Sequence, residues 1–138
     1  MVIDTSAIFA AIAGEPDRDV YRSAIISAPL RLISAVTLLE TQIVLVSRSG
    51  GNSIPILREL IERAGIAVVP FDEPMVEVAF EAFKRYGKGQ GHKAQLNIID
   101  CVAYALAKTR DLSLLFKGND FAATDVRAAI PSRRQLLP

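Results

Sequence analysis

Cysteine and histidine are almost missing from this sequence, and tryptophan is absent. Cys101 is the only cysteine, so an internal disulfide framework is impossible and a reducing compartment is expected. His92 is the only histidine, which excludes hydrolases that use two histidines as acid and base. A Ser-His-Asp triad would have to use His92, yet no G-x-S-x-G turn accompanies it. One cysteine and one histidine also cannot make a structural zinc site.

The sequence also lacks a long apolar run and an excess of charge of one sign. No apolar stretch approaches the roughly 20 residues of a membrane span, and no basic segment with a cleavage site suggests a signal peptide. The formal net charge is +1 and 51% of the residues are hydrophobic, which excludes a disordered chain and argues against a strongly basic nucleic-acid coat protein. We therefore expect one cytoplasmic globular domain over residues 1–138, with a poorly ordered tail from about Pro131.

Short apolar runs alternate with longer segments of helical spacing. The runs at 1–3, 30–33, 66–69 and 112–116 are predicted strands, and helices are predicted over 7–13, 17–27, 54–64 and 96–110. Another helix is expected after Ser34, ending at Ser49-Gly50-Gly51, and a further one begins at Pro74. This alternation predicts an α/β fold with a central, mostly parallel sheet and helices on both faces, a three-layer α/β/α sandwich.

Four carboxylates stand among apolar neighbours in this pattern. Asp4 and Asp120 each follow a predicted strand. Taken alone, Asp4 is better explained as a helix cap than as a ligand, and Asp120 is explained equally well as either. Glu40 lies one helical turn from Val36 and Ile43, so it is expected to face the body of the protein, unless it is a surface acid.

Asp100 is the clearest exception of the four. It is the only charged residue between Lys93 and Lys108, in a helix that is apolar nearly all round, so it needs a partner there. An arginine is one alternative, and a shared metal ion is another.

The positions of the four acids bring them to one edge of a parallel sheet, where ligands bind in such folds. Carboxylates that meet there repel one another unless a hard cation bridges them, and oxygen-only ligation suits Mg²⁺ or Mn²⁺. Asp4 is therefore predicted to be a metal ligand rather than only a cap.

The segments that carry these acids resemble the PIN-domain ribonucleases, most closely the VapC-type toxins of bacterial toxin–antitoxin pairs. The resemblance rests on VIDTSA at the start, LLE, LNIIDCVAYALA and LLFKGNDF, in this order over nearly the whole chain. YGKG upstream of LN..DC, and FKG.DF..TD after it, match one VapC branch particularly well.

The resemblance implies an Mg²⁺- or Mn²⁺-dependent endoribonuclease whose metal ligands and catalytic residues match Asp4, Glu40, Asp100 and Asp120. The polar neighbours expected to orient the ligands are Thr5, Ser6, Asn97 and Asn119. In the same way, the family implies a VapB-like antitoxin as partner, a homodimer, and an RNA substrate (tRNA, rRNA or mRNA).

The sequence departs from this branch at two positions. Ile99 stands where glycine usually precedes the aspartate, and Asn119 stands where another aspartate is common. The second change removes charge from the site and puts a second metal ion in doubt, although Asp125 is a weaker candidate to compensate.

A flexible basic loop, GKGQGHK at 87–93, is the candidate RNA contact. Lys88, His92 and Lys93 lie in it, and Lys117 stands near Asp120. These side chains are equally explained as a solvated surface.

Two other functions stay open from the sequence alone: a non-catalytic PIN-like binding module, and another Mg²⁺-dependent phosphohydrolase. The haloacid-dehalogenase type of phosphatase is disfavoured, since Ser6 stands where its second aspartate would be.

Overall fold

The computed structural model describes residues 1–131, so the tail expected beyond Pro131 lies outside the described residues. Its centre is a four-stranded sheet in the order β3-β2-β1-β4, in which every pairing is parallel. The strands are β1 (Val2–Ile3), β2 (Leu32–Ser34), β3 (Ala67–Val69) and β4 (Leu114–Leu115). The predicted parallel sheet is confirmed, although its strands are shorter than the apolar runs from which they were predicted.

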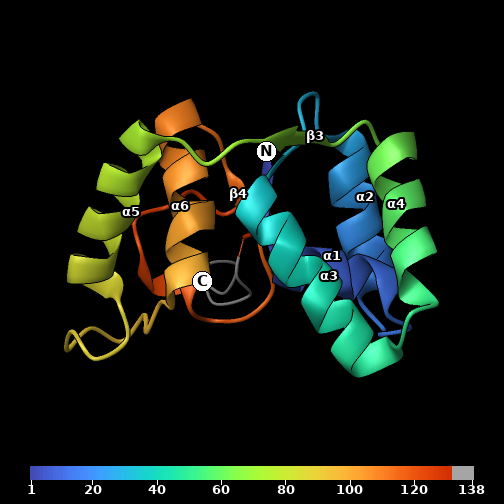
Figure 1. The fold of residues 1–138 in the computed structure, drawn as a ribbon, viewed down its shortest axis with the longest axis horizontal. Helices are drawn as coiled ribbons and strands as arrows, with labels where there is room; N and C mark the ends of the chain where they lie inside the picture. The colour runs from blue at the N-terminus through green and yellow to red at the C-terminus, as the bar shows by residue number, and fades with distance from the viewer. Residues whose placement is uncertain (132–138) are drawn as a thin grey trace, which may run out of the picture.

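Helices cover both faces of this sheet, as Figure 1 shows. On one side lie α5 (Glu73–Tyr86) and α6 (Ile98–Arg110), and on the other lie α1 (Thr5–Ile12), α2 (Arg18–Ser27) and α4 (Ser53–Arg63), with α3 (Ala35–Ser49) crossing between the two groups. A 3₁₀ turn, η1 (Phe121–Ala123), follows β4. The three-layer α/β/α architecture predicted from the sequence is confirmed.

The core consists of two apolar clusters, one on each face of the sheet, because successive strand residues point to opposite faces. Val2 and Leu114 belong to the cluster under α5 and α6, whereas Ile3 and Leu115 belong to the cluster under α1, α2 and α4. The middle of α6 is the most deeply buried helical segment among the described residues, with every residue from Cys101 to Ala107 buried, whereas Ile98 at the start of the helix is exposed. The prediction of a core helix there is confirmed.

Most helix boundaries follow local signals. The Ser34 side chain accepts a hydrogen bond from the Val36 amide and the Asp72 side chain accepts one from the Met75 amide. Gly65 has φ +60° just after α4, a left-handed conformation that glycine adopts without steric cost. Asn52 precedes α4, but its side chain makes no capping hydrogen bond.

The orientation of α3 differs from the prediction. Leu39, Ile43 and Val46 are exposed, whereas Thr37 and Thr41 are buried. The buried side combines these threonines with Leu45, and it contacts α1 through a hydrogen bond between the Thr41 and Thr5 hydroxyl oxygens, which lie 3.0 Å apart. Much of the apolar surface of α3 therefore faces outward.

Among residues 1–131, no helix has both the length and the hydropathy needed to cross a membrane.

Candidate active site

Asp4 is both a helix cap and a buried acid with a free oxygen. It follows β1 directly, and its Oδ2 accepts hydrogen bonds from the Ser6 amide (3.0 Å) and the Ser6 hydroxyl (2.6 Å). Its Oδ1 is buried without a hydrogen-bond partner, and the residue is only 4% exposed. Burial raises the pKa of Asp4, Ser6 lowers it, and the negative charge of Glu40 raises it further. The capping role thus uses one carboxylate oxygen and leaves the other available.

Asp100 is fixed at the start of α6 by a reciprocal cap. The Asn97 side chain accepts a hydrogen bond from the Asp100 amide (2.8 Å), and Asp100 Oδ2 accepts one from the Asn97 amide (2.9 Å). Burial raises the pKa of Asp100 to about 7 against the lowering effect of the Asn97 amide, and the charges of Asp4, Asp120 and Glu40 raise it as well.

Asp100 therefore lies within electrostatic range of the other three predicted acids, and Asp4 lies within electrostatic range of Glu40. Glu40 is half-buried in the second turn of α3, and Asp120 is exposed where η1 begins, anchored by the buried Phe121. In the described part of the chain, however, no three His, Cys, Asp or Glu side chains are grouped closely enough to hold a metal ion as they stand.

The polar neighbours divide into different roles. Ser6 and Asn97 hydrogen-bond directly to Asp4 and Asp100, respectively. The Thr5 hydroxyl instead contacts Thr41 and the Thr37 carbonyl, so its side chain joins α1 to the helix that carries Glu40. Asn119 is exposed in the turn that precedes Asp120.

Two of the predicted RNA contacts, Lys117 and His92, already interact with other side chains or main-chain groups of the protein. The Lys117 ammonium pairs with Glu15 and with Asp17 (2.9 Å), and its hydrogen bonds to these carboxylates raise the pKa of Lys117. His92 is half-buried, its Nδ1 accepts a hydrogen bond from the Ala94 amide, and its ring meets Tyr86 edge-on at 4.9 Å.

Lys88 and Lys93 are exposed in the 87–93 loop. Unlike Lys117, neither of them forms an ion pair within the described residues.

Asp125 does not compensate for Asn119, because it belongs to another cluster. One of its oxygens accepts a hydrogen bond from the Tyr104 hydroxyl (2.5 Å) and the other accepts one from Lys108 (3.2 Å). Sequence reasoning also missed the Lys117–Glu15–Asp17 contact. No local signal could have revealed it, because Glu15 and Asp17 flank Pro16 in what is otherwise an ordinary polar turn.

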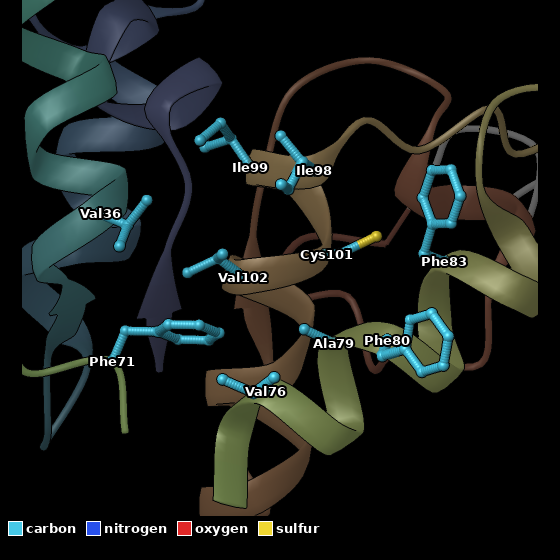
Figure 2. A pocket seen from close by; sticks show the side chains of 10 residues that line it. All are labelled: Val36, Phe71, Val76, Ala79, Phe80, Phe83, Ile98, Ile99, Cys101 and Val102. Atoms are coloured by element: carbon cyan, nitrogen blue, oxygen red, sulfur yellow. The ribbon is translucent and has the colours of Figure 1, made fainter. Parts of the chain in front are cut away.

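An apolar groove lies beside the acids. Figure 2 shows it between α3, α6 and α5, with Val36 on one side, Ile98 and Ile99 next to Asp100, and Phe80 and Phe83 on the other side. Its volume is about 520 Å³, and every side chain that lines it is apolar.

The comparisons with known proteins agree with this arrangement. The model of the PIN domain family matches residues 1–127. A protein named Ribonuclease VapC from Mycolicibacterium smegmatis is 44% identical over 128 residues, covering 93% of this chain and 98% of that protein. Ribonuclease VapC28 from Mycobacterium tuberculosis is 43% identical over 133 residues, covering 96% of this chain and 100% of that protein.

Solved structures show the same fold at lower identity. The crystal structure of Mycobacterium tuberculosis VapC20, described as a Sarcin-Ricin loop cleaving toxin, has a TM-score of 0.75 at 19% identity, covering 91% of this chain and 95% of that one. A toxin–antitoxin complex from Klebsiella pneumoniae has a TM-score of 0.65 at 17% identity, covering 90% of this chain and 92% of that one. With its acids at the carboxyl edge of a parallel sheet and VapC relatives matched over nearly their full length, this chain belongs to the PIN-domain family, in its VapC-type branch.

Proposed function

We propose that this chain is a metal-dependent endoribonuclease, the toxin of a toxin–antitoxin pair, which hydrolyses RNA phosphodiester bonds at Asp4, Glu40, Asp100 and Asp120. The observation that carries the proposal is Asp4 Oδ1, a buried carboxylate oxygen without a partner in a site where three further acids lie within electrostatic range. Buried polar atoms are normally paired, so such an oxygen calls for a ligand. The names of the VapC relatives support RNA as the substrate.

The donor set fits a hard divalent cation. All four candidate ligands are carboxylates, and Mg²⁺ and Mn²⁺ prefer oxygen ligands. Asp4 would contribute its unpaired Oδ1, and Asp100 would contribute the oxygen that its cap leaves free, with Glu40 and Asp120 completing the set. A bound cation lowers the pKa of a water molecule and stabilises the charge that develops on phosphoryl oxygens.

The chain's own contribution is to hold these groups in place. Asp4 and Asp100 are each hydrogen-bonded to the first turn of a helix, so little side-chain freedom remains to be lost when they bind. The amino termini of α1 and α6 carry partial positive charge, which offsets the carboxylates and favours a phosphate nearby. Lys88 and Lys93, which are exposed, are the proposed contacts to RNA phosphates, and such contacts do not read sequence.

The test is cleavage of a pool of structured cellular RNAs with Mg²⁺ or Mn²⁺, by the wild type and by Asp100→Asn. We expect cleavage that requires the metal and is lost in the variant. Asp19→Asn is the matched control, because Asp19 is an exposed acid on α2 with only a 3.8 Å contact to Arg18, and it should cleave like the wild type.

Each contrary outcome has its own meaning. Equal cleavage by wild type and Asp100→Asn would point to a contaminating nuclease and remove the mechanism. A folded protein that binds no Mn²⁺ would favour a non-catalytic PIN-like module. Cleavage of small phosphate esters but not of RNA would favour another Mg²⁺-dependent phosphohydrolase.

A VapB-like antitoxin is the proposed partner, and the hollow between α1, α2 and α4 is its proposed contact. Ile26 and Ile56 are exposed in this hollow, and Arg22, Glu59 and Arg63 line it with charge. An apolar floor with a charged rim suits a peptide segment that binds and dissociates. Arginine or lysine from the antitoxin could then neutralise the acidic site.

The groove of Figure 2, together with the outward face of α3, is the proposed homodimer surface. Leu39, Ile43 and Phe80 are more than half exposed there. A contiguous apolar surface without charged lining resembles permanent interfaces rather than transient ones.

A further inference from the structure

Lys117 joins two segments that are far apart in the sequence. It lies in the turn after β4, and its ammonium contacts Glu15 and Asp17, which belong to the turn between α1 and α2. Two carboxylates thus hold one ammonium that sequence reasoning assigned to RNA. An ammonium held in this way is a poor candidate for a phosphate contact, because a phosphate would have to displace both carboxylates.

The main chain of Lys117 reaches the active site through Ser6. The Lys117 N–H donates a hydrogen bond to Ser6 Oγ (2.9 Å), and the Ser6 hydroxyl donates to Asp4 Oδ2 (2.6 Å). Because Ser6 Oγ accepts from Lys117 on one side, its own hydrogen is directed toward Asp4. Asp4 Oδ2 therefore receives two hydrogen bonds from Ser6, and Asp4 Oδ1 receives none.

The turn that carries this N–H has little else to hold it. Residues 117–120 are all exposed, and Gly118 has φ +111°, a conformation that favours glycine. The flanking anchors are the buried Phe121 and a long hydrogen bond from the Tyr21 hydroxyl to the Phe116 carbonyl (3.4 Å). Phe116 and Phe121 also pack against each other, with ring centroids 5.3 Å apart. Exposed turns with few contacts open most easily, so the two salt bridges of Lys117 restrain the residue that carries this amide.

We propose that Lys117 is a positioning residue for Asp4: its ammonium, held by Glu15 and Asp17, fixes the turn whose amide sets the Ser6 hydroxyl on one Asp4 oxygen and leaves the other open for the cation. This inference rests on the proposed function. It assigns Lys117 to the geometry of the metal ligand rather than to RNA binding.

The experiment measures Mn²⁺ affinity by calorimetry on the full chain, for the wild type, Lys117→Met, Ser6→Ala and the double variant. Outer partners of metal ligands typically contribute about 10–100-fold to affinity or activity. We expect Ser6→Ala to weaken Mn²⁺ binding by about tenfold and Lys117→Met by about fivefold. The double variant should bind Mn²⁺ with about the same affinity as Ser6→Ala alone, because both residues act through the same series of contacts to Asp4.

Two further variants serve as a conservative replacement and as a control for the Mn²⁺ measurement. Lys117→Arg can still pair with both carboxylates, so it should restore Mn²⁺ affinity to near the wild-type value. Arg127→Met removes an exposed ion pair with Asp111 (3.5 Å), outside every proposed site, and should leave Mn²⁺ affinity unchanged. In RNA cleavage, Lys117→Met should lower kcat with little change in KM.

Several results would overturn the inference. A raised KM for RNA with unchanged Mn²⁺ affinity would make Lys117 an RNA contact, and a lower Tm with unchanged Mn²⁺ affinity would make it only structural. Additive losses in the double variant would remove the link through Ser6. A wild type that binds no Mn²⁺ would remove the proposed function as well, whereas tight binding by both wild type and Lys117→Met would remove this inference alone.

Discussion

Asn97 and Asp100 hold each other at the first turn of α6. Each side chain accepts a hydrogen bond from the other residue's main-chain amide, at 2.8 Å and 2.9 Å. One pair of contacts therefore both begins the most buried helix and orients an acid at the carboxyl edge of the sheet. In this chain the start of a core helix and the geometry of the candidate active site depend on the same two residues.

Asn97→Ala should lower both stability and activity. It removes the acceptor for the Asp100 amide, which costs about 1 kcal/mol of unfolding free energy, and it leaves Asp100 less well oriented, for a loss of about tenfold or more in kcat. Asn97→Ser keeps a capping oxygen and should keep most of both. Urea denaturation and RNA cleavage below the unfolding range measure the two effects. Full activity in Asn97→Ala would show that the cap does not position Asp100.

Asp100→Asn should stabilise the metal-free protein at neutral and higher pH. In the folded state the pKa of Asp100 is about 7, raised first by burial, against 3.8 as the ordinary value. Between these values the folded state binds more protons than the unfolded state, so the free energy of unfolding falls as pH rises. Asparagine does not titrate, and the variant should lack this decline.

The expected gain above pH 7 is about 1 kcal/mol, reduced because Asp100 is only partly buried, or about 3–5 °C in Tm. Thermal unfolding in EDTA from pH 4 to pH 8 measures it. Below pH 4 the two proteins should have the same Tm. A wild type whose stability does not change between pH 4 and pH 7, relative to the variant, would contradict the assigned pKa.

Asp125→Asn should weaken the fold and leave Mn²⁺ affinity unchanged. Partial burial acts to raise the pKa of Asp125, but the hydrogen bonds from Tyr104 and Lys108 and the charges of Lys108 and Arg85 outweigh it and lower the pKa. Asp125 therefore contributes stability above its ordinary pKa of 3.8, which is lost as pH falls through its lower folded value.

At pH 7 we expect Asp125→Asn to lower Tm by a few degrees, about 1 kcal/mol for charged hydrogen bonds that are partly exposed. Asp120→Asn is the contrasting variant, since it should weaken Mn²⁺ binding with little effect on Tm. Weaker Mn²⁺ binding by Asp125→Asn would return Asp125 to the metal site.

Arg31→Met should destabilise the protein without touching the active site. The Arg31 guanidinium donates to the carbonyls of Ile25 and Ile26 in α2 and of Ala64 at the end of α4 (2.6 Å for Ala64). It satisfies carbonyls at two helix ends, where a positive charge is also favoured. The expected loss is about 2 kcal/mol in urea denaturation. Arg127→Met, which removes an exposed pair with Asp111, should stay within about 0.5 kcal/mol of the wild type.

Phe80→Asp and Ile43→Asp should convert the proposed homodimer to a monomer. Both side chains are more than half exposed on the proposed dimer surface of α5 and α3, and a buried unpaired carboxylate in an apolar interface is costly. Light scattering after size exclusion measures the mass. Ile26→Asp, in the hollow between α1, α2 and α4, should leave the mass unchanged and weaken antitoxin binding. A wild-type monomer at the concentrations tested would remove the proposed dimer.

The sequence by itself determined the order of the elements, because that information is local. The apolar runs, Ser34 and Pro74 indicate where strands and helices begin, and the alternation of strands and helices predicts a parallel sheet. The unusual position of Asp100 in an apolar helix was also visible, since one charge among apolar neighbours needs no structure to be noticed.

Only the tertiary structure decided how side chains from distant segments meet. Leu39 and Ile43 face outward, while Thr41 on the buried side of α3 hydrogen-bonds to Thr5 of α1. Asp125 hydrogen-bonds to Tyr104 and Lys108 and does not join the other acids. The tertiary structure also joined Lys117 to Glu15, Asp17 and Ser6 across about 100 residues of chain. Contacts of this kind depend on the packing of the whole sheet and its helices, and no local pattern of residues encodes them.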